Sequence, residues 1–329
     1  MEWTGLIIGF IFGIILQRGR VCFNSAFRDI FLMKDNYLMK LATFVLALET
    51  IFFLFFAQMG WITLNPKPLN WLGNILGGLI FGFGMVLAGG CASGTTYRVG
   101  EGMTTAWFAA IFYAIGATMT KSGALSGWVK WLSKFNVTVE HSSPLYVEKA
   151  GPTLATVFNV NPWVVGLIFA VILLIYTFAT KTTPRSSKMG WKTAALLLAI
   201  LAPFAWMASA ATGRNYGLGI TGGWIGLIKS ATTGTKLSWE AIEIIGIIIG
   251  ALVSALASKE FKLRMPKNPI TYLQVMIGGL LMGFGAVTAG GCNVGHFLTG
   301  IPTLAISSLI AGVFFILGNW FMAWILYGR

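Results

Sequence analysis

The chain has 329 residues, of which 56% are hydrophobic and only 10% are charged, and its mean hydropathy is +0.78. A soluble domain of this length needs far less apolar surface, so the composition excludes one and indicates a protein embedded in lipid. The net charge of +13 fits either contact with anionic lipid or an anionic cargo. The basic residues lie in short loops rather than on one soluble face, which argues against nucleic acid as a partner.

Nine apolar runs have roughly the length that a helix needs to cross a membrane, which is about 20 residues. They cover residues 3–17, 40–60, 70–90, 103–121, 162–180, 191–211, 239–258, 270–290 and 303–327. The first run has no basic segment before it and no small-residue cleavage site after it, so we expect a retained span rather than a signal peptide. The pattern predicts an all-α integral membrane protein with nine transmembrane helices.

The basic residues sort to one side of these nine spans. Loops 18–40, 181–192 and 259–267 fall on the same face as Arg98 and Arg329, and this face holds most of the 23 Lys and Arg residues. The positive-inside bias assigns that face to the cytoplasm, which leaves the N-terminus outside and the C-terminus inside. The long loop 122–161 is then external, and its amphipathic start around Trp128 and Trp131 is expected at the membrane interface.

Two stretches of the chain repeat each other. LGGLIFGFGMVLAGGC (76–91) and IGGLLMGFGAVTAGGC (277–292) are identical at 11 of 16 positions, with a constant offset of 201 residues. Five crossings separate the copies, and an odd number turns the second copy upside down, which gives two inverted repeats with pseudo-two-fold symmetry. We expect a first repeat at 1–121, an external loop and connector span at 122–190, and a second repeat at 191–329.

Four short segments join paired spans within the repeats. Residues 21–33, 92–102, 217–230 and 293–301 are too short to span a bilayer and too apolar or Gly-rich for ordinary loops. They are interpreted as four short re-entrant half-helices, two in each repeat, because broken backbone at membrane depth is tolerated where protein or a cavity satisfies it.

Cys22, Cys91 and Cys292 are the three cysteines, and we expect free thiols since all lie in or beside apolar runs. Gly90-Cys91-Ala92-Ser93 and Gly291-Cys292 each follow a span at the start of a half-helix, where unpaired N–H groups favour an anion. Packing as a small hydrophobe is the ordinary alternative. Two thiols at equivalent repeat positions favour a functional role. A thiol suits a soft, sulphur-bearing ligand. Copper(I) is disfavoured by the basic charge and the lack of Cys-x-x-Cys or Met-x-x-Met spacing, so no metal or cofactor is predicted.

The paired Gly-Gly-Cys stretches, the segment Arg20-Val21-Cys22-Phe23-Asn24 and the stretch Gly219–Gly222 resemble the YeeE/YedE family of bacterial sulphur transporters. The resemblance covers essentially the whole chain. It implies import of thiosulfate across the inner membrane, with the three cysteines relaying the ion, and a small cytoplasmic sulphur-carrier protein of the TusA type as partner. The residues alone indicate only a soft anion and an inverted repeat.

In the resulting hypothesis the anion passes a constriction lined by three protonated thiols and half-helix N-termini. The candidate path residues are Cys22, Asn24, Gly90, Cys91, Ala92, Ser93, Thr221, Gly291 and Cys292, with Arg20 and Arg98 at the mouths. Helix capping explains Asn24 and Thr221 equally well, and lipid phosphate or topology explains the arginines. Glu101 is expected to pair with Arg98. Glu49, inside a span, is the candidate for proton coupling, and a packing hydrogen bond is its alternative.

Two rival functions remain open at this point. A membrane sulphurtransferase would carry sulphur as a cysteine persulphide, and Cys22 near Arg20 is its only candidate thiol. A channel for another small sulphur anion, such as sulfite, would have the same architecture but would form no covalent intermediate on a cysteine.

Overall fold

The computed structural model describes residues 2–182 and 189–328. Arg185, Lys188 and Arg329, which the sequence assigns to the basic face, lie outside the described residues. Two small sheets are present in the described part, so the all-α class holds for the membrane-spanning body with minor β structure outside it.

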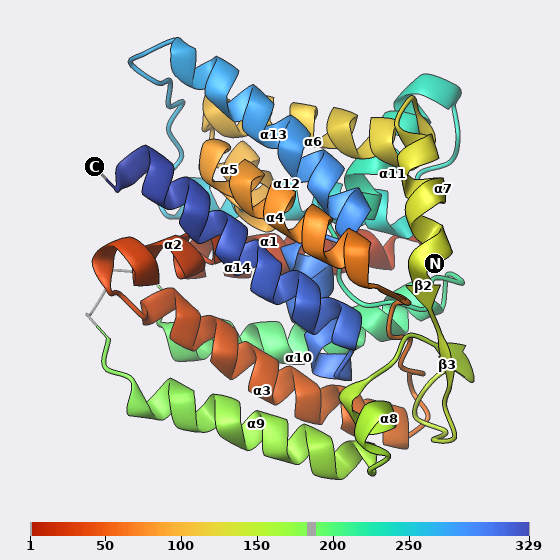
Figure 1. Cartoon of the computed structure of the whole chain (residues 1–329). Coiled ribbons are helices and arrows are strands. Elements are labelled where there is room, and N and C mark those ends of the chain that lie inside the picture. Colours follow the sequence, from red (N-terminus) through yellow and green to blue (C-terminus); the bar gives the residue numbers. More distant parts are fainter. Residues whose placement is uncertain (1, 183–188, 329) are drawn as a thin grey trace.

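Helices account for most of the described chain (Figure 1). The first half contains α1 (Thr4–Gly19), α2 (Phe23–Met33), α3 (Tyr37–Gln58), α4 (Trp71–Leu87), α5 (Ala92–Gly100) and α6 (Thr104–Ser122). α9 (Pro162–Ala179) lies between the halves. The second half contains α10 (Trp191–Ala210), α11 (Thr221–Thr233), α12 (Trp239–Ala257), α13 (Ile270–Ala289), η2 (Val294–Gly300), η3 (Ile301–Thr303) and α14 (Ile306–Tyr327).

Eight helical stretches of the described chain are long and apolar enough to cross a membrane. Three of them join a long helix to the short helix or helices that follow it: Thr4–Met33, Trp71–Gly100 and Ile270–Thr303, the last of which includes both η2 and η3. The ninth run expected from the sequence, 103–121, does form a helix, α6, but this helix is not among the eight. The protein is therefore a multi-pass helical membrane protein, and the count of nine crossings stays a prediction.

Local sequence explains where several helices begin and end. The Asn70 side chain accepts a hydrogen bond from the Gly73 amide at the start of α4, and Ser238 does the same for Ala241 in α12. Gly290 ends α13 with φ +86°, a left-handed conformation that favours glycine.

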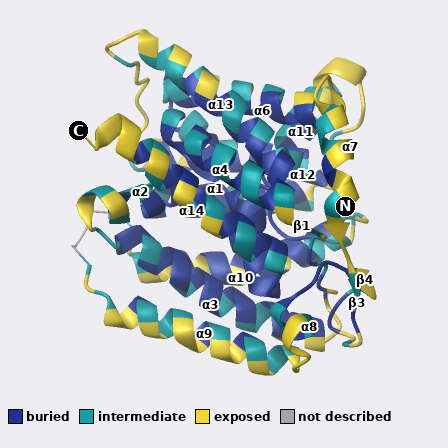
Figure 2. Cartoon of the chain, in the orientation of Figure 1, coloured by how far each residue is buried: buried dark blue, intermediate teal, exposed yellow. Residues whose placement is uncertain are grey.

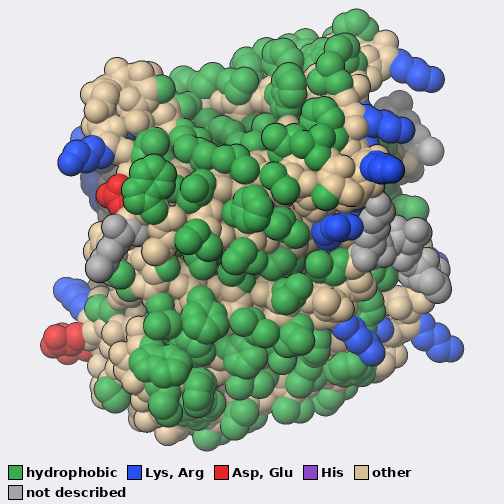
Figure 3. Space-filling view, turned by 180° about the vertical axis from the view of Figure 1, so that it is seen from behind, with side chains coloured by type: hydrophobic (Ala, Val, Ile, Leu, Met, Phe, Trp, Pro, Cys, Tyr) green, Lys and Arg blue, Asp and Glu red, His purple; other side chains and the backbone are tan. Residues whose placement is uncertain are grey.

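The outside of the bundle is apolar. Hydrophobic side chains cover its middle, and Lys and Arg side chains gather at its two edges (Figure 3). α9 is the least covered of the candidate spans, with 22% of its apolar window buried (Figure 2). This band is the surface expected to face lipid tails.

α4 and α13 cross in the centre of the molecule through glycines at equivalent positions. A Cβ on Gly77 would lie 2.3 Å from the amide nitrogen of Ala289, and a Cβ on Gly278 would lie 2.3 Å from that of Ala88. Only glycine allows backbones to approach this closely. Around this crossing, α4 also packs against α14 and α13 against α6, while α1 packs against α12 and α3 against α10.

The long segment after α6 is ordered into small elements. It holds α7 (Ser126–Leu132), η1 (Ser133–Phe135), β2 (Asn136–Val137), β3 (Val139–Glu140), β4 (Lys149–Ala150) and α8 (Leu154–Phe158). β2 pairs antiparallel with β1 (Leu69–Asn70), and β3 pairs with β4. The Trp128 indole N–H of α7 donates to Thr288 Oγ1 at 3.2 Å, so the stretch expected at the membrane interface packs partly on α13.

Helix direction separates the two ends of the bundle. In Figure 1, α1 begins at the right of the view and α14 ends at the left. The segments after α3, α6 and α10 lie at the end where α1 begins. The segments after α1, α5 and α12 lie at the opposite end.

Candidate functional site

Cys22 and Cys91 face each other in the interior. Both side chains are buried, and their sulphur atoms lie 3.7 Å apart. This separation is well beyond the 2.05 Å of a disulfide, and both thiols are free, as the sequence predicts. Cys22 immediately precedes α2 and Cys91 immediately precedes α5. Each thiol therefore stands at the N-terminus of a short helix, where the helix dipole favours negative charge.

The turn at Cys91 is built from small residues. The Cys91 sulphur accepts the Gly94 amide at 3.3 Å and lies 3.5 Å from the Ser93 hydroxyl oxygen. A Cβ on Gly94 would lie 2.7 Å from the Cys22 sulphur and 3.2 Å from that of Cys91. The two thiols thus fill the space that glycine leaves open. Ala92 and Ser93 are also buried here.

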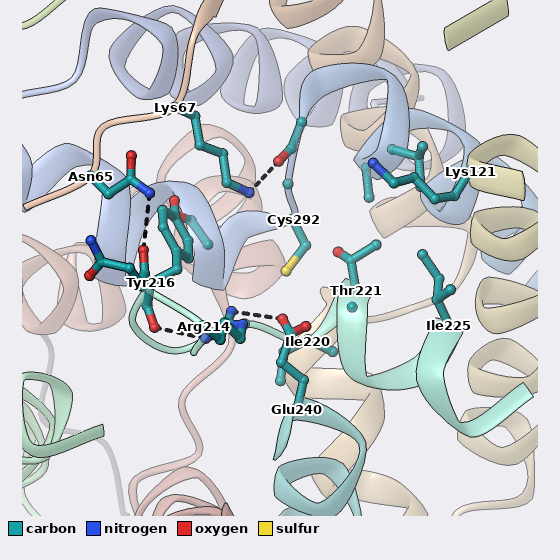
Figure 4. Close-up of a pocket in the computed structure, with 18 of the residues that line it drawn as sticks. Asn65, Lys67, Lys121, Arg214, Tyr216, Ile220, Thr221, Ile225, Glu240 and Cys292 are labelled. Atoms are coloured by element: carbon teal, nitrogen blue, oxygen red, sulfur yellow. Dashed lines mark hydrogen bonds and ion pairs between the residues drawn. The ribbon is translucent and has the colours of Figure 1, made fainter. Parts of the chain in front are cut away.

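Cys292 lines a cavity of about 470 Å³, whose walls come from the loops after α3 and α10, the end of α6, the starts of α11 and α12, and the end of α13. Gly291 and Thr221 line the same cavity, together with the cationic side chains of Lys67, Lys121 and Arg214. In Figure 4 the Cys292 sulphur points into the space between Lys67, Thr221 and Arg214. The arrangement offers positive charge and one thiol to an anion that enters from this end.

The segments that follow Cys91 and Cys292 meet. The Ala92 amide donates to Asn293 Oδ1 at 3.3 Å. These two residues hold equivalent positions in the repeat, since 201 residues separate them. Asn293 follows Cys292 and Ala92 follows Cys91. Their hydrogen bond therefore places the turn at Cys292 against the turn that holds the Cys22–Cys91 pair.

Arg98 binds the turn between α4 and α5. Its Nη1 donates to the Gly89 carbonyl at 3.0 Å, and a Cβ on Gly90 would lie 2.7 Å from that nitrogen. Glycine at position 90 therefore makes room for the guanidinium. The expected pairing of Arg98 with Glu101 is wrong, because the Glu101 carboxylate is bound elsewhere.

Arg20 holds that carboxylate. It forms ion pairs with buried Glu101 and with Glu260, the second at 2.8 Å. Gln17 donates to both carboxylates, at 3.1 and 2.8 Å. This cluster ties the ends of α1, α5 and α12 together. The Arg20 side chain, two residues before Cys22, is thus bound by two carboxylates. It is not an unpaired cation at the entrance of a route, as the sequence had suggested.

The far wall of the cavity is held by Arg214. Its guanidinium donates to the carbonyls of Tyr216 and Gly217 at 2.7 and 2.6 Å and pairs with Glu240 at 2.7 Å (Figure 4). The Thr221 hydroxyl lies 2.7 Å from the Tyr113 hydroxyl of α6. Thr221 therefore both lines the cavity and anchors the start of α11.

Asn24 and Glu49 lie deeper in the bundle. Asn24 is buried and its Oδ1 accepts the Asn319 amide at 2.6 Å, so it bridges α2 and α14. Glu49 is fully buried, and neither of its carboxylate oxygens has a hydrogen-bond partner among the described residues. The packing hydrogen bond that would give Glu49 a structural role is therefore not made in this part of the chain.

Sequence reasoning missed several residues of the cavity. Lys67, Lys121, Tyr216 and Glu240 were not singled out, although all four line it. Lys67 lies in a short loop, where the sequence Asn65-Pro66-Lys67-Pro68 carries no motif. Burial and the positive charge of Arg214 lower the pKa of Lys67 to about 8.

The sequence profile of the family described as "Sulphur transport" matches residues 18–321. The chain belongs to this family. The YeeE/YedE resemblance seen in the sequence is thereby confirmed, and the protein is a transporter rather than an enzyme.

Two relatives match this chain over its whole length. The chain is 61% identical to the thiosulfate transporter TsuA of Spirochaeta thermophila, with all of both chains covered. It is 32% identical to the thiosulfate transporter TsuA of Escherichia coli K12, covering all of this chain and 96% of the relative. A probable transporter YedE of Salmonella typhimurium is 37% identical over 35% of this chain and 28% of its own. The family thus supports sulphur transport across a membrane as the activity.

Proposed function

We propose that this protein takes up thiosulfate across the bacterial inner membrane. In this proposal the ion enters the cavity at Cys292 and passes a constriction lined by Cys292, Cys91 and Cys22 and by helix N-termini. The observation that carries it is the continuity of these groups: a cationic cavity ends at Cys292, and the Ala92–Asn293 contact links that site to the two facing thiols.

The chemistry of the ion fits this route. Thiosulfate is a dianion with a terminal sulphur, which can accept S–H contacts from one protonated thiol after another. A thiolate would repel it. Weak contacts at several sites favour passage over trapping. The helix starts after Cys91 and Cys22 supply amide dipoles for the oxygens.

An inverted repeat is part of the proposal. Equivalent glycines support it: a Cβ on Gly84 would lie 2.5 Å from the Met282 amide nitrogen, and one on Gly285 would lie 2.5 Å from that of Phe81. Helix packing supports it as well, because exchanging the halves turns the α1–α12 contact into α10–α3 and the α4–α14 contact into α13–α6. Residues 1–121 and 191–329 are the two repeats, and 122–190 connects them.

The proposed topology has nine crossings, with α6 as the ninth, the N-terminus outside and the C-terminus in the cytoplasm. The opposite placement of the α1 start and the α14 end is consistent with an odd number of crossings. The short segments α2, α5, α11 and η2–η3 are the four re-entrant pieces. The cavity with Cys292 then faces outward and the Arg20–Glu101–Glu260 cluster faces the cytoplasm.

Energy limits how far uptake can proceed alone. Moving a dianion into a cell against 100 mV costs about 4.6 kcal/mol. Net import therefore needs either a coupled cation or rapid removal of sulphur inside. A TusA-type sulphur-carrier protein at the cytoplasmic face would provide removal, and Glu49 is the proposed acid for proton coupling.

Radiolabelled uptake by purified protein in liposomes tests the proposal. Thiosulfate should enter, unlabelled thiosulfate should compete, and sulfite should compete weakly. Preferential movement of sulfite would favour the channel for another sulphur anion. Mass spectrometry of protein exposed to thiosulfate is the second arm: unmodified thiols favour passage, whereas a stoichiometric persulphide would favour a sulphurtransferase.

A further inference from the structure

Lys67 reaches from its loop to the turn that carries Cys292. Its ammonium donates to the carbonyl of Gly290, the residue that ends α13, and lies 4.5 Å from the centre of the Tyr216 ring (Figure 4). A Cβ on Gly291 would lie 3.4 Å from the same nitrogen. The ammonium therefore stands next to the residue that precedes Cys292.

The other repeat has the same device. Gly89 is the equivalent of Gly290, both have a left-handed backbone (φ +70° and +86°), and the Gly89 carbonyl is bound by Arg98 at 3.0 Å. In each copy a cation from outside the Gly-Gly-Cys turn thus holds the same carbonyl. Lys67 is the counterpart of Arg98 at the opposite end of the route, although no sequence similarity marks it.

Lys67 also stands at the boundary of two spaces. The cavity of about 470 Å³ and a second one of about 300 Å³ share Lys67, Lys121 and Gly290 in their walls. Both partners of the Lys67–Gly290 hydrogen bond thus line both cavities. A lysine in a loop has the freedom to leave that carbonyl, and a doubly charged anion offers it a stronger, charge-assisted hydrogen bond.

We propose that Lys67 is the outer anion-binding residue, which leaves the Gly290 carbonyl to hold the incoming sulphur anion beside Cys292. This rests on the proposed uptake of thiosulfate and names the residue that captures it. The Arg214 guanidinium is held in place by the carbonyls of Tyr216 and Gly217 and by Glu240. It therefore contributes positive electrostatic potential to the cavity without changing its partners. Lys67 forms no ion pair with a carboxylate among the described residues. Its ammonium can therefore exchange the Gly290 carbonyl for an incoming anion.

The charges around Lys67 set the pH at which it works. The groups that face it from neighbouring elements are Arg214, Tyr216, Glu240, Cys292, His296 and Lys121. Burial, followed by the charge of Arg214, lowers its pKa to about 8, whereas an exposed lysine titrates near 10.4. The ammonium is thus mostly present at pH 7 and is lost as the pH rises through 8. Anion capture should decline over the same interval.

The test is thiosulfate uptake in liposomes from pH 6.5 to 9.5, with KM and maximal rate determined separately. Lys67→Met should raise KM about tenfold or more at pH 7, which is the loss of one charge-assisted hydrogen bond. It should also remove the decline near pH 8. Lys67→Arg, whose charge persists, should move that decline to higher pH. Lys130→Met removes the charge of an exposed α7 side chain that lines neither cavity, and it should leave KM unchanged.

The outcomes separate this inference from the function on which it rests. Wild-type protein that moves no thiosulfate overturns both. Wild-type uptake with an unchanged KM in Lys67→Met overturns the inference alone. A decline near pH 8 that persists in Lys67→Arg would assign the decline to another titrating group and also overturn the role of Lys67. Membrane content of each variant, measured by immunoblot, identifies any that fail to fold.

Discussion

Gly94 offers a way to disturb the Cys22–Cys91 pair without changing either cysteine. It lies in the first turn of α5, and its missing side chain leaves the space that the two thiols occupy. Gly94→Ala would add one methyl group there. The substitution is conservative for the helix, because alanine favours a helix over glycine by about 1 kcal/mol.

The size of the effect follows from the geometry. The added Cβ would lie 2.7 Å from the Cys22 sulphur, about 1 Å closer than ordinary contact. Overpacking of a tight interior costs about 1–3 kcal/mol. If that strain displaces the thiol from the route, uptake should fall about fivefold to a hundredfold, at 1.4 kcal/mol for each factor of ten.

A matched control exists at the equivalent position of the second repeat. A Cβ on Gly295 would meet no atom within 4 Å, so Gly295→Ala should fold as wild type does and keep its maximal rate; because Gly295 lines the 470 Å³ cavity, any effect should appear in KM. The assay is initial thiosulfate uptake in liposomes at equal protein content. Maximal rate is the informative parameter, because the proposed constriction lies beyond the proposed site of first binding.

Equal rates for Gly94→Ala and wild type would refute the reasoning. The pair of thiols would then be either off the route or free to move aside without cost. Equal losses in both alanine variants would indicate a general effect of glycine replacement rather than a clash with Cys22.

Three further predictions test other parts of the structure. Cys91→Ala should abolish thiosulfate uptake and Cys91→Ser should restore little of it, since a hydroxyl is a harder donor; wild-type uptake by the alanine variant would remove Cys91 from the route. Glu49→Gln should flatten the dependence of uptake on an inward proton gradient, measured with a pH dye inside the liposomes, and a full pH dependence in the variant would exclude Glu49 as the coupling acid. Gly77→Ala should lower the thermal unfolding temperature in detergent, because its Cβ would meet the main chain of α13 at 2.3 Å and such overpacking costs about 1–3 kcal/mol. Gly127→Ala on α7 is the control: its Cβ would meet no atom within 4 Å, so the unfolding temperature should not change.

Features that depend on local sequence could be predicted. The apolar runs correspond to helices because burial in lipid leaves the backbone few alternatives. The Gly-Gly-Cys turns were found because a repeat offset of 201 residues is visible in the letters. The free state of Cys22, Cys91 and Cys292 followed from their apolar surroundings and is confirmed.

Features that depend on tertiary contact could not be predicted. Arg98 lies near the end of α5 and Glu101 directly follows that helix, which suggested an ion pair. Glu101 instead binds Arg20 across 81 residues, and Glu260 completes the cluster from 240 residues away. Lys67 meets Gly290 across 223 residues, and no pattern in its loop marks this contact. Cys22 meets Cys91 because α2 and α5 begin at the same place, which spacing alone does not reveal.

The main-chain contact between α4 and α13 restricts how the protein can work. Gly77, Gly84, Gly278 and Gly285 bring the main chains of the two helices into direct contact. Rocking one half against the other would part these backbones and open an unfilled gap. The α4–α13 scaffold is therefore expected to stay rigid during turnover. The anion would then pass by movements of single side chains, and the two halves would not need to rock between outward-open and inward-open states.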